Sequence, residues 1–259
     1  MSRAVPATRA VLRSAFSDAA ARRSAFWWQI GAMIANDLAW VAFWVIFFHE
    51  VASVRGWDVD RVLLLLAVLC TSAGLVLGLL SNSRRIPTLV ADGSLDEVLT
   101  LPVAPLPHLL VRRIDTVNLG DVAFGLVLFA VAAHPTPQRT LVYVAGTLAS
   151  AVLLTGFLVL TGSLVFFTGR GESADLGLNA VLLLASYPAD VFAGATKVLL
   201  YTAVPAAFVS GVPAELVDDF DVGDATLMLG VAGLFAALGW GTFTAGLRRY
   251  SSGSVWDRG

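Results

Sequence analysis

Residues 81–113 read SNSRRIPTLVADGSLDEVLTLPVAPLPHLLVRR, and they form the longest polar break in a mostly apolar sequence. The break contains two pairs of adjacent arginines, and prolines cluster in its second half. The apolar segments on both sides are long enough to cross a bilayer as helices. This stretch therefore predicts a polar loop that joins two membrane-spanning helices, and the rest of the fold follows from that arrangement.

The composition is that of a polytopic membrane protein. Of the 259 residues, 57% are hydrophobic and 14% are charged, whereas soluble domains carry about 25% charged residues. The mean hydropathy is +0.78, which predicts an all-α protein with several transmembrane helices. Cys70 is the single cysteine, so no disulfide forms within the chain. No basic face with interleaved aromatic residues is present, so nucleic acid is not an expected partner.

Six apolar stretches are predicted to be transmembrane helices. They are residues 25–48, 61–80, 114–133, 140–167, 174–187 and 225–247. The second contains Gly74 and Gly78, a spacing that allows close helix approach either within the chain or between two copies. The third carries Asp115 and Asp121 in its first turns, where the helix dipole favours acids.

The two ends of the chain are predicted to lie outside this domain. Residues 8–23 place apolar side chains at helical spacing, which indicates an amphipathic helix in the headgroup layer. A frayed basic tail is the alternative. The predicted organisation is a cytoplasmic N-terminus, one transmembrane domain with a cytoplasmic loop, and a cytoplasmic tail. The corresponding ranges are 1–24, 25–247 with the loop at 81–113, and 248–259.

A broken apolar segment precedes the last span. Residues 188–210 contain two prolines and are predicted to form a re-entrant or outer hairpin, followed by an acidic outer loop at 211–224. Asp190 and Lys197 lie seven residues apart, so a helix would place them on one face. Pairing of Lys197 with Asp37 and snorkelling of the lysine to the outer headgroups are the alternatives.

Asn36 and Asp37 lie near the middle of the first predicted span. An ionisable side chain at that depth is costly unless it faces protein or water. Two explanations stay open for this pair. It is either the polar lining of a path through the protein, or a structural hydrogen-bonding group for a neighbouring helix.

The positive charges predict the orientation. Thirteen arginines fall on segments assigned to one side, including the loop at 81–113 and both ends of the chain, and three fall on the other side. Lysine and arginine concentrate in cytoplasmic loops. Both termini and the loop are therefore predicted to be cytoplasmic, in agreement with an even number of crossings.

Residues that would support catalysis in this chain are missing. Lys197 follows a threonine rather than a glycine, so no Walker A phosphate loop is present. His49, His108 and His134 are divided between the two predicted membrane faces and cannot share a metal. We therefore expect no enzyme activity, metal or cofactor in this chain.

A short helix is predicted within the loop, from Ser94 to Thr100. Ser94 and Glu97 have the spacing of a capping box, and Pro102 ends the helix. Asp96 and Glu97 suit the first turn because the helix dipole favours acids there. Leu95, Val98 and Leu99 are predicted to form an apolar edge, and the flanking Arg84, Arg85, Arg112 and Arg113 to lie at the lipid headgroups.

Two blocks of sequence resemble a known family. DGSLDEVL at 92–99, LPV at 101–103 and PL at 105–106 resemble the G-x-L-D-x-x-L-x-x-P-V-x-x-L segment of ABC-2 type transporter permeases of the compact six-span subgroup. YPADVF at 187–192, VPAAFV at 204–209 and VPA at 212–214 resemble that subgroup's second conserved block. One departure is Leu101, where members often carry a basic residue.

The resemblance implies a function. Such permeases pair as homodimers or heterodimers in the plasma membrane, and two cytoplasmic ABC ATPase subunits bind ATP and Mg²⁺ and dock beneath them. The implied cargo is a hydrophobic or amphipathic compound that is exported. The implied coupling helix to the ATPase is Ser94, Leu95, Asp96, Glu97, Val98 and Leu99. The residues expected along the path or gate are Asn36, Asp37, Tyr187, Pro188, Asp190 and Lys197.

Two other classes of function stay open on the residues alone. An ion- or proton-coupled secondary carrier would use Asp37 and Lys197 as its charged groups. A membrane scaffold without transport activity would need neither. Dependence of transport on ATP separates the first alternative from the permease, and any transport at all excludes the second.

Overall fold

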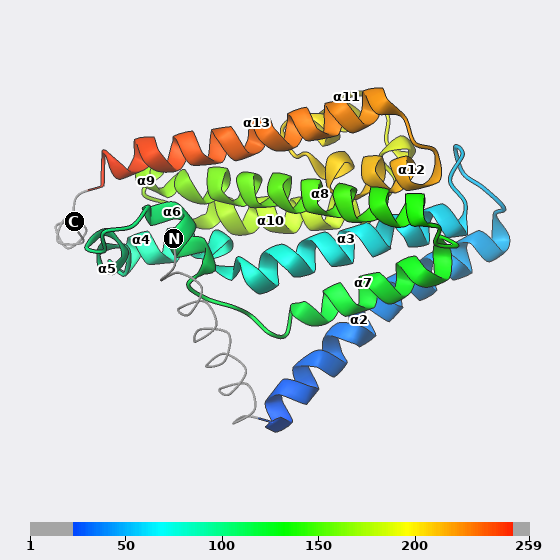
Figure 1. The fold of residues 1–259 in the computed structure, drawn as a ribbon, viewed down its shortest axis with the longest axis horizontal. Helices are drawn as coiled ribbons and strands as arrows, with labels where there is room; N and C mark the ends of the chain where they lie inside the picture. Colours follow the sequence, from blue (N-terminus) through cyan, green and yellow to red (C-terminus); the bar gives the residue numbers. More distant parts are fainter. Residues whose placement is uncertain (1–22, 251–259) are drawn as a thin grey trace.

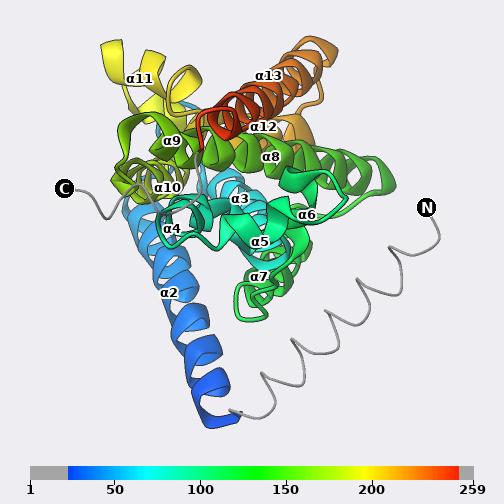
Figure 2. The same cartoon turned by 90° about the vertical axis from the view of Figure 1, so that its left-hand side faces the viewer.

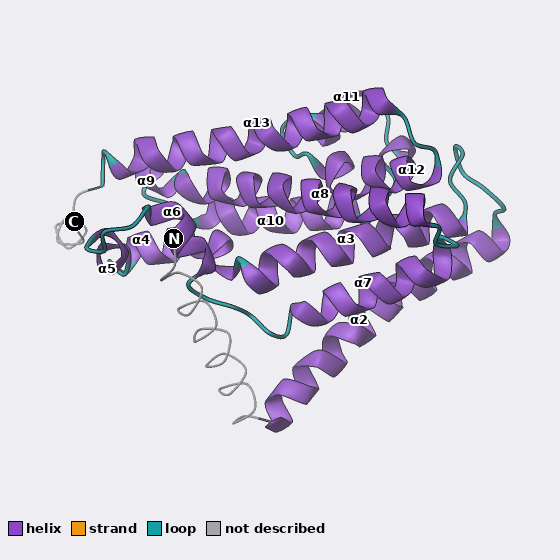
Figure 3. Cartoon of the chain, viewed as in Figure 1, coloured by secondary structure: helices purple, strands orange, loops and turns teal. Residues whose placement is uncertain are grey.

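The computed structural model describes residues 23–250 of the chain. Within this range every regular element is helical, apart from a single bridge between Val54 and Trp57 (Figure 3). The predicted amphipathic helix at 8–23 falls almost wholly outside the described residues, as does the end of the C-terminal tail. The longer helices are α2 (Arg23–Glu50), α3 (Val59–Leu79), α7 (Leu119–Ala132), α8 (Pro137–Ser163), α10 (Glu172–Ala185) and α13 (Val222–Leu247).

Four described helices are long and apolar enough to cross a membrane: α2, α3, α8 with its extension α9 (Val165–Thr168), and α13. The other two predicted spans form shorter helices, α7 and α10, of 14 residues each. The sequence placed the start of α7 near Ile114, but the helix begins at Leu119. Asp115 prevents an earlier start, because its backbone N–H donates to Gly78 O at 2.8 Å and its carboxylate accepts from Val117 N.

Helix α3 lies at the centre of the bundle, between α7 and α8 (Figure 1). Gly74 and Gly78 face α7, and a Cβ atom on Gly74 would lie 2.8 Å from Val122 N. The small-residue face of α3 therefore packs within this chain. On the other side of the bundle, α8 and α13 cross at Gly156 and Gly239, where a Cβ atom on Gly239 would lie 2.6 Å from Gly156 O. Both helix pairs depend on backbones that touch.

Helix α2 is the exception, because it leaves the bundle toward its N-terminal end (Figure 2). Over the 18 most apolar residues, 11% of α2 is buried, compared with 78% of α3. Its C-terminal half is held by Trp44, which packs in a cluster with Trp57 and with residues of α3. Near the N-terminal end of α2, Trp27 and Trp28 are 66% and 80% exposed, so this end is available to lipid or another protein.

The segment between α10 and α13 is more helical than predicted. It contains η2 (Ala189–Val191), α11 (Gly194–Tyr201), a π-helical turn η3 (Ala207–Gly211) and α12 (Val212–Asp218). The prediction of an acidic outer loop at 211–224 is wrong for its first half, since α12 is a helix with a buried apolar face. The acidic residues suggested a loop. Val212, Leu216 and Val217 nevertheless have amphipathic helical spacing, and they pack in the core.

The two ends of the bundle differ in charge as the sequence predicts. One end carries the folded loop at 81–113, α9 and the C-terminal end of α13 (Figure 1). The opposite end carries the α2–α3 connection, the α7–α8 turn and α12. Both arginine pairs of the loop and Arg248-Arg249 thus lie at the same end.

Candidate functional site

The loop at 81–113 folds into a compact cap of four short helices: η1 (Ser81–Arg85), α4 (Ile86–Ala91), α5 (Leu95–Leu99) and α6 (Pro105–Val111). The cap has its own core, in which Ile86, Leu95 and Leu109 are at most 1% exposed. That core continues into the bundle through Val159 of α8 and Phe243 of α13. The loop is therefore packed directly on the ends of two long helices.

Buried polar groups hold the cap together. Ser81 Oγ donates to the Arg113 carbonyl oxygen at 2.9 Å, which joins the first and last residues of the loop. Asn82 Nδ2 donates to the Leu109 carbonyl oxygen at 2.8 Å. Both side chains are at most 4% exposed. Hydrogen bonds in a dry environment fix the geometry strongly because breaking one leaves a buried polar group unpaired.

The predicted capping box at Ser94 and Glu97 does not form. The Ser94 side chain makes no cap to α5, and instead Ser94 N donates to Asp92 Oδ1 at 3.0 Å. Hydrogen bonds from Ser94 lower the pKa of the Asp92 carboxyl. Glu97 turns to the neighbouring α6 end, where Arg112 Nη2 lies 2.8 Å from its carboxylate. Asp92 therefore accepts the backbone N–H of Ser94 that a capping box would pair with Glu97.

The predicted apolar edge of the loop helix is also wrong in part. Leu95 and Val98 are 0% and 2% exposed and belong to the core of the cap. The exposed apolar side chains come one turn later: Leu99, Leu101 and Val103 are 38%, 42% and 47% exposed. We call these three residues the loop tip. The spacing of apolar residues predicts an amphipathic helix, but it does not predict which of these residues pack against other parts of the same chain.

Two of the four arginines of the loop form ion pairs with acidic residues of the chain. Arg84 lies 3.6 Å from the Asp115 carboxylate, and Arg112 is paired with Glu97. The location of these two arginines at the lipid headgroups stays a prediction. Such exposed pairs contribute about 1 kcal/mol or less to stability.

A polar cavity of about 220 Å³ lies between α2, α3, α7 and α10. Its lining brings Asn36 and Asp37 of α2 together with Asp121 of α7. The Asp37 and Asp121 carboxyl groups therefore share one cavity, although they belong to different helices. Asp37 Oδ2 and Asp121 Oδ1 are buried without a hydrogen-bond partner among the described residues.

Asp121 is the residue that sequence reasoning missed. Its position in the first turn of α7 fits the helix dipole, as predicted. The same position also places it opposite Asp37, across the face of α3 that carries Cys70. No sequence spacing relates Asp37 to Asp121, because they lie on different helices.

A second cavity, of about 440 Å³, follows toward the outer end of α2. Phe43, Trp44 and Phe47 line one side of it, and Tyr187 and Pro188 line the other. The rings pack edge to face, with the Trp44 and Tyr187 centroids 5.6 Å apart. Tyr187 and Pro188, both predicted along the path, therefore lie on the wall of this cavity.

Asp190 is the centre of a polar cluster beside the aromatic cavity. Lys197 Nζ lies 2.6 Å from Asp190 Oδ1, and Trp57 Nε1 donates to Asp190 Oδ2 at 3.2 Å. Partial burial opposes ionisation of Asp190, but the hydrogen bonds from Lys197 and Trp57 outweigh it and lower its pKa. The predicted pairing of Asp190 with Lys197 is confirmed, and Lys197 is absent from the lining of the cavity that contains Asp37.

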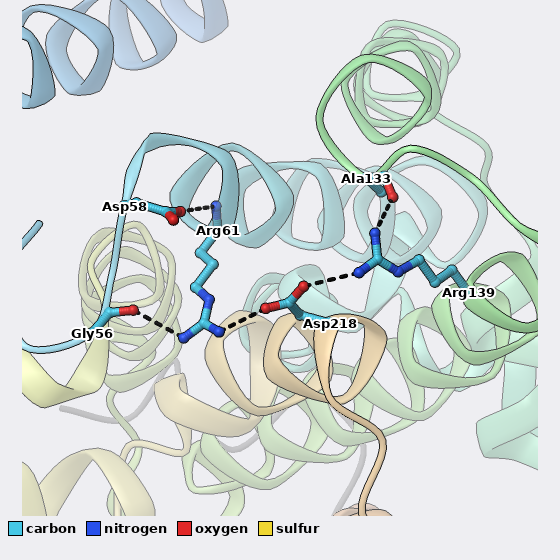
Figure 4. A network of polar contacts seen from close by, with 6 residues as sticks. All are labelled: Gly56, Asp58, Arg61, Ala133, Arg139 and Asp218. Atoms are coloured by element: carbon cyan, nitrogen blue, oxygen red, sulfur yellow. Dashed lines mark hydrogen bonds and ion pairs between the residues drawn. The ribbon is translucent and has the colours of Figure 1, made fainter. Parts of the chain in front are cut away.

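A further network at the same end holds the packed helices together (Figure 4). Asp218 of α12 bridges two arginines, at 2.8 Å to Arg61 of α3 and 3.1 Å to Arg139 of α8. Arg139 also donates to the Ala133 carbonyl oxygen at the end of α7. One carboxylate thus joins the outer ends of α3, α7 and α8.

The described residues contain no group of three or more histidine, cysteine, aspartate or glutamate side chains that could hold a metal ion. The cap packs on α8 and α13, and the two cavities described above lie beside α2.

Comparison with known proteins identifies the family. Residues 34–254 match the sequence profile of the ABC-2 family transporter proteins. No curated protein and no solved structure matches the chain. The match covers all the long helices, except for the N-terminal part of α2, and both blocks of sequence that carry the resemblance. The chain belongs to the ABC-2 transporter family, whose members are multi-pass membrane components that typically lack an ATPase domain of their own.

Proposed function

We propose that this chain is the permease subunit of an ATP-driven exporter in the plasma membrane. ATP and Mg²⁺ are bound by a separate cytoplasmic ABC ATPase, present in two copies beneath a pair of permeases. The second permease is either a copy of this chain or a homologous one. The cargo is a hydrophobic or amphipathic compound. The family assignment supports this role, and the folded loop at 81–113 carries the argument.

The loop has the construction that a force-receiving element requires. The loop tip exposes three apolar side chains at the end of the molecule, while the rest of the cap is packed on α8 and α13. Buried hydrogen bonds from Ser81 and Asn82 hold the cap together as one folded unit. A protein that pushes on the tip therefore moves the ends of α3, α8 and α13 with it.

Six crossings with both termini in the cytoplasm fit this arrangement. Helices α7 and α10 each have 14 residues, or about 21 Å at 1.5 Å per residue, somewhat less than a hydrocarbon core of about 30 Å. Both connect opposite ends of the bundle, and irregular residues continue them at their termini (Figure 1). The arginine-rich end of the bundle is then the cytoplasmic end.

Pairing of two permeases is supported by the exposed apolar faces of the outer helices. On α2, Phe43, Val45 and Ile46 are 47%, 45% and 68% exposed. On α13, over its most apolar stretch, 22% of the residues are buried. These faces contact lipid or the second permease. The broken segment 188–210 lies at the outer end and serves as the gate in this proposal.

Co-purification tests the proposal directly. The tagged chain is extracted from its native membrane, and we expect an ABC ATPase subunit, identified by mass spectrometry, together with ATP hydrolysis by the purified complex. Leu99→Asp is expected to weaken that complex by about tenfold or more, since a charge then occupies an apolar contact. The readout is the ratio of ATPase to permease after washing.

The matched control is Val51→Asp, the same change at the opposite end of the bundle. Val51 is 39% exposed and Leu99 is 38% exposed, so both substitutions carry a similar risk for folding. Val51→Asp should leave the complex intact. Equal recovery of the ATPase with the two variants, or its absence from the unmodified complex, would contradict the proposal.

A further inference from the structure

The polar cavity and the aromatic cavity form one seam between α2 and α10. Leu183 of α10 lines both of them. Trp40 lines the polar cavity and packs edge to face on Tyr187 of the aromatic cavity, with ring centroids 5.6 Å apart. The seam therefore runs from the middle of α2 toward its outer end without an intervening layer of packed helices. It lies on the loosely packed side of the molecule.

The inner part of the seam lacks positive charge. Of the described residues that line the polar cavity, none is lysine, arginine or histidine, whereas Asp37 and Asp121 are both present. One oxygen of each carboxylate is buried without a partner among the described residues. An uncompensated carboxylate at membrane depth is costly, so such groups pair with a proton or a cation. The site is short of one positively charged group.

The outer part of the seam contains aromatic side chains and one indole N–H group without a hydrogen-bond acceptor. Trp44 is 4% exposed and lines the aromatic cavity, and its indole N–H has no hydrogen-bond acceptor among the described residues. Buried indole N–H groups usually have a partner. The surrounding faces of Phe43, Phe47 and Tyr187 attract both apolar groups and cations. A bound molecule with a hydrogen-bond acceptor would satisfy Trp44.

We propose that the seam between α2 and α10 binds an amphipathic organic cation as the exporter's cargo. Its positive group lies against Asp37 and Asp121, and its apolar or aromatic body lies among Phe43, Trp44 and Tyr187. The volume of about 440 Å³ of the outer cavity falls within the range of about 300–1,000 Å³ typical of small-molecule sites. This inference rests on the proposed permease function and specifies its substrate class.

Equilibrium binding to the isolated permease tests the inference without the ATPase. The chain is placed in nanodiscs of phosphatidylcholine, and dialysis measures binding of tetraphenylphosphonium, with empty nanodiscs subtracted. Tetraphenylborate, an anion of nearly the same size and shape, is the comparison ligand. We expect the cation to bind about tenfold or more tightly than the anion, because charge is the property in which the two differ most. Equal binding of both ions would overturn the inference.

Variants then locate the site. The double change Asp37→Asn with Asp121→Asn keeps the side-chain volume and removes both charges, and it should lower the affinity for tetraphenylphosphonium by about tenfold. Asp219→Asn, at an exposed outer aspartate, is the control and should have no effect. Unchanged cation binding in the double variant would refute the assignment to this seam. If the double variant is unstable, Phe43→Ala with Phe47→Ala tests the aromatic half, and unchanged binding there refutes it equally.

The two proposals fail in different ways. If no ATPase is recovered with the unmodified protein, the proposed permease function is refuted, and the cargo proposal that rests on it is refuted as well. Failure of tetraphenylphosphonium to bind, while the ATPase complex is intact and sensitive to Leu99→Asp, removes only the substrate class. Binding is read from the ligand and coupling is read from the partner protein, so neither result depends on the other.

Discussion

Helices α2 and α3 are both long and apolar, yet they have opposite roles in the structure. Over comparable windows, 78% of α3 is buried in the chain and 11% of α2 is buried. Helix α3 packs on α7, α8 and α12, whereas α2 touches the bundle mainly through its outer half. Both helices are apolar enough to cross a membrane, and α3 is the more apolar of the two. Being apolar enough to cross a membrane therefore does not by itself place a helix at the centre of the fold.

The sizes of the side chains account for the difference. Helix α3 presents Gly74 and Gly78 to α7, and the backbones of the two helices approach until no Cβ atom would fit. The facing part of α2 carries Trp40, Phe43 and Trp44, which keep the neighbouring helices apart. In a membrane, close packing rather than the hydrophobic effect holds helices together. The spaces that remain beside α2 are the two cavities.

The largest effect is expected where the packed helices touch. In Gly156→Leu the new side chain meets the backbone of α13, since even a Cβ atom would lie 2.5 Å from Phe235 O. Backbone atoms cannot move aside as a flexible side chain can, so we expect α8 and α13 to separate. The loss exceeds the roughly 1–3 kcal/mol typical of overpacking. Yield of monodisperse protein after detergent extraction, measured by size-exclusion chromatography, reports it.

Gly241→Leu is the matched control on the same helix pair. A Cβ atom at Gly241 meets nothing within 4 Å, and the residue is exposed on α13. The control should extract and elute like the unmodified chain. If Gly156→Leu extracted and eluted like Gly241→Leu, then close contact of α8 and α13 at Gly156 would not be required for folding.

Much of this architecture follows from the sequence. The four long spans were predicted within a few residues of α2, α3, α8 and α13, because a bilayer demands a minimum apolar length. The loop at 81–113 was recognised because charge and proline interrupt that length. The Asp190–Lys197 ion pair was predicted from helical spacing and does form, but the two residues lie in different helices, η2 and α11, so one continuous helix is not its cause. Local rules thus identified elements and short-range contacts.

Features that depend on contacts between distant segments could not be predicted. Leu95 and Val98 face inward because they join the core of the cap, which continues to Val159 and Phe243. Neither of the latter two lies near the loop in the sequence. Asp121 joins Asp37 only because α7 and α2 flank the same side of α3. The capping box failed for a local reason, since Asp92 competes for the backbone N–H of Ser94. Spacing describes which residues share a face, but not what the face meets.

A second prediction compares α3 with α2 directly. Leu65 of α3 is 0% exposed, and Leu65→Ala leaves a cavity among packed side chains. Because lipid tails are as apolar as leucine, only the cavity part of the usual cost applies, about 1–2 kcal/mol. Thermal unfolding in nanodiscs should show a lower Tm. Ile46→Ala on α2, where the side chain is 68% exposed, should change the Tm much less. Equal losses would mean that α2 is as tightly held as α3.

The smallest effect is expected at the ion pairs of Asp218 with Arg61 and Arg139, which we call the outer clamp. The clamp joins the packed helices and does not include α2. Asp218→Asn removes the charge that bridges Arg61 and Arg139, while the amide keeps the volume. The Asp218 and Arg139 side chains are 31% and 33% exposed, so water screens the pairs and the loss is about 1 kcal/mol or less. The Tm should fall by about 2–4 °C at low salt and recover most of the difference at about 1 M NaCl. Asp219→Asn should leave the Tm unchanged, and a salt-independent loss in Asp218→Asn would show that the clamp acts through packing rather than charge.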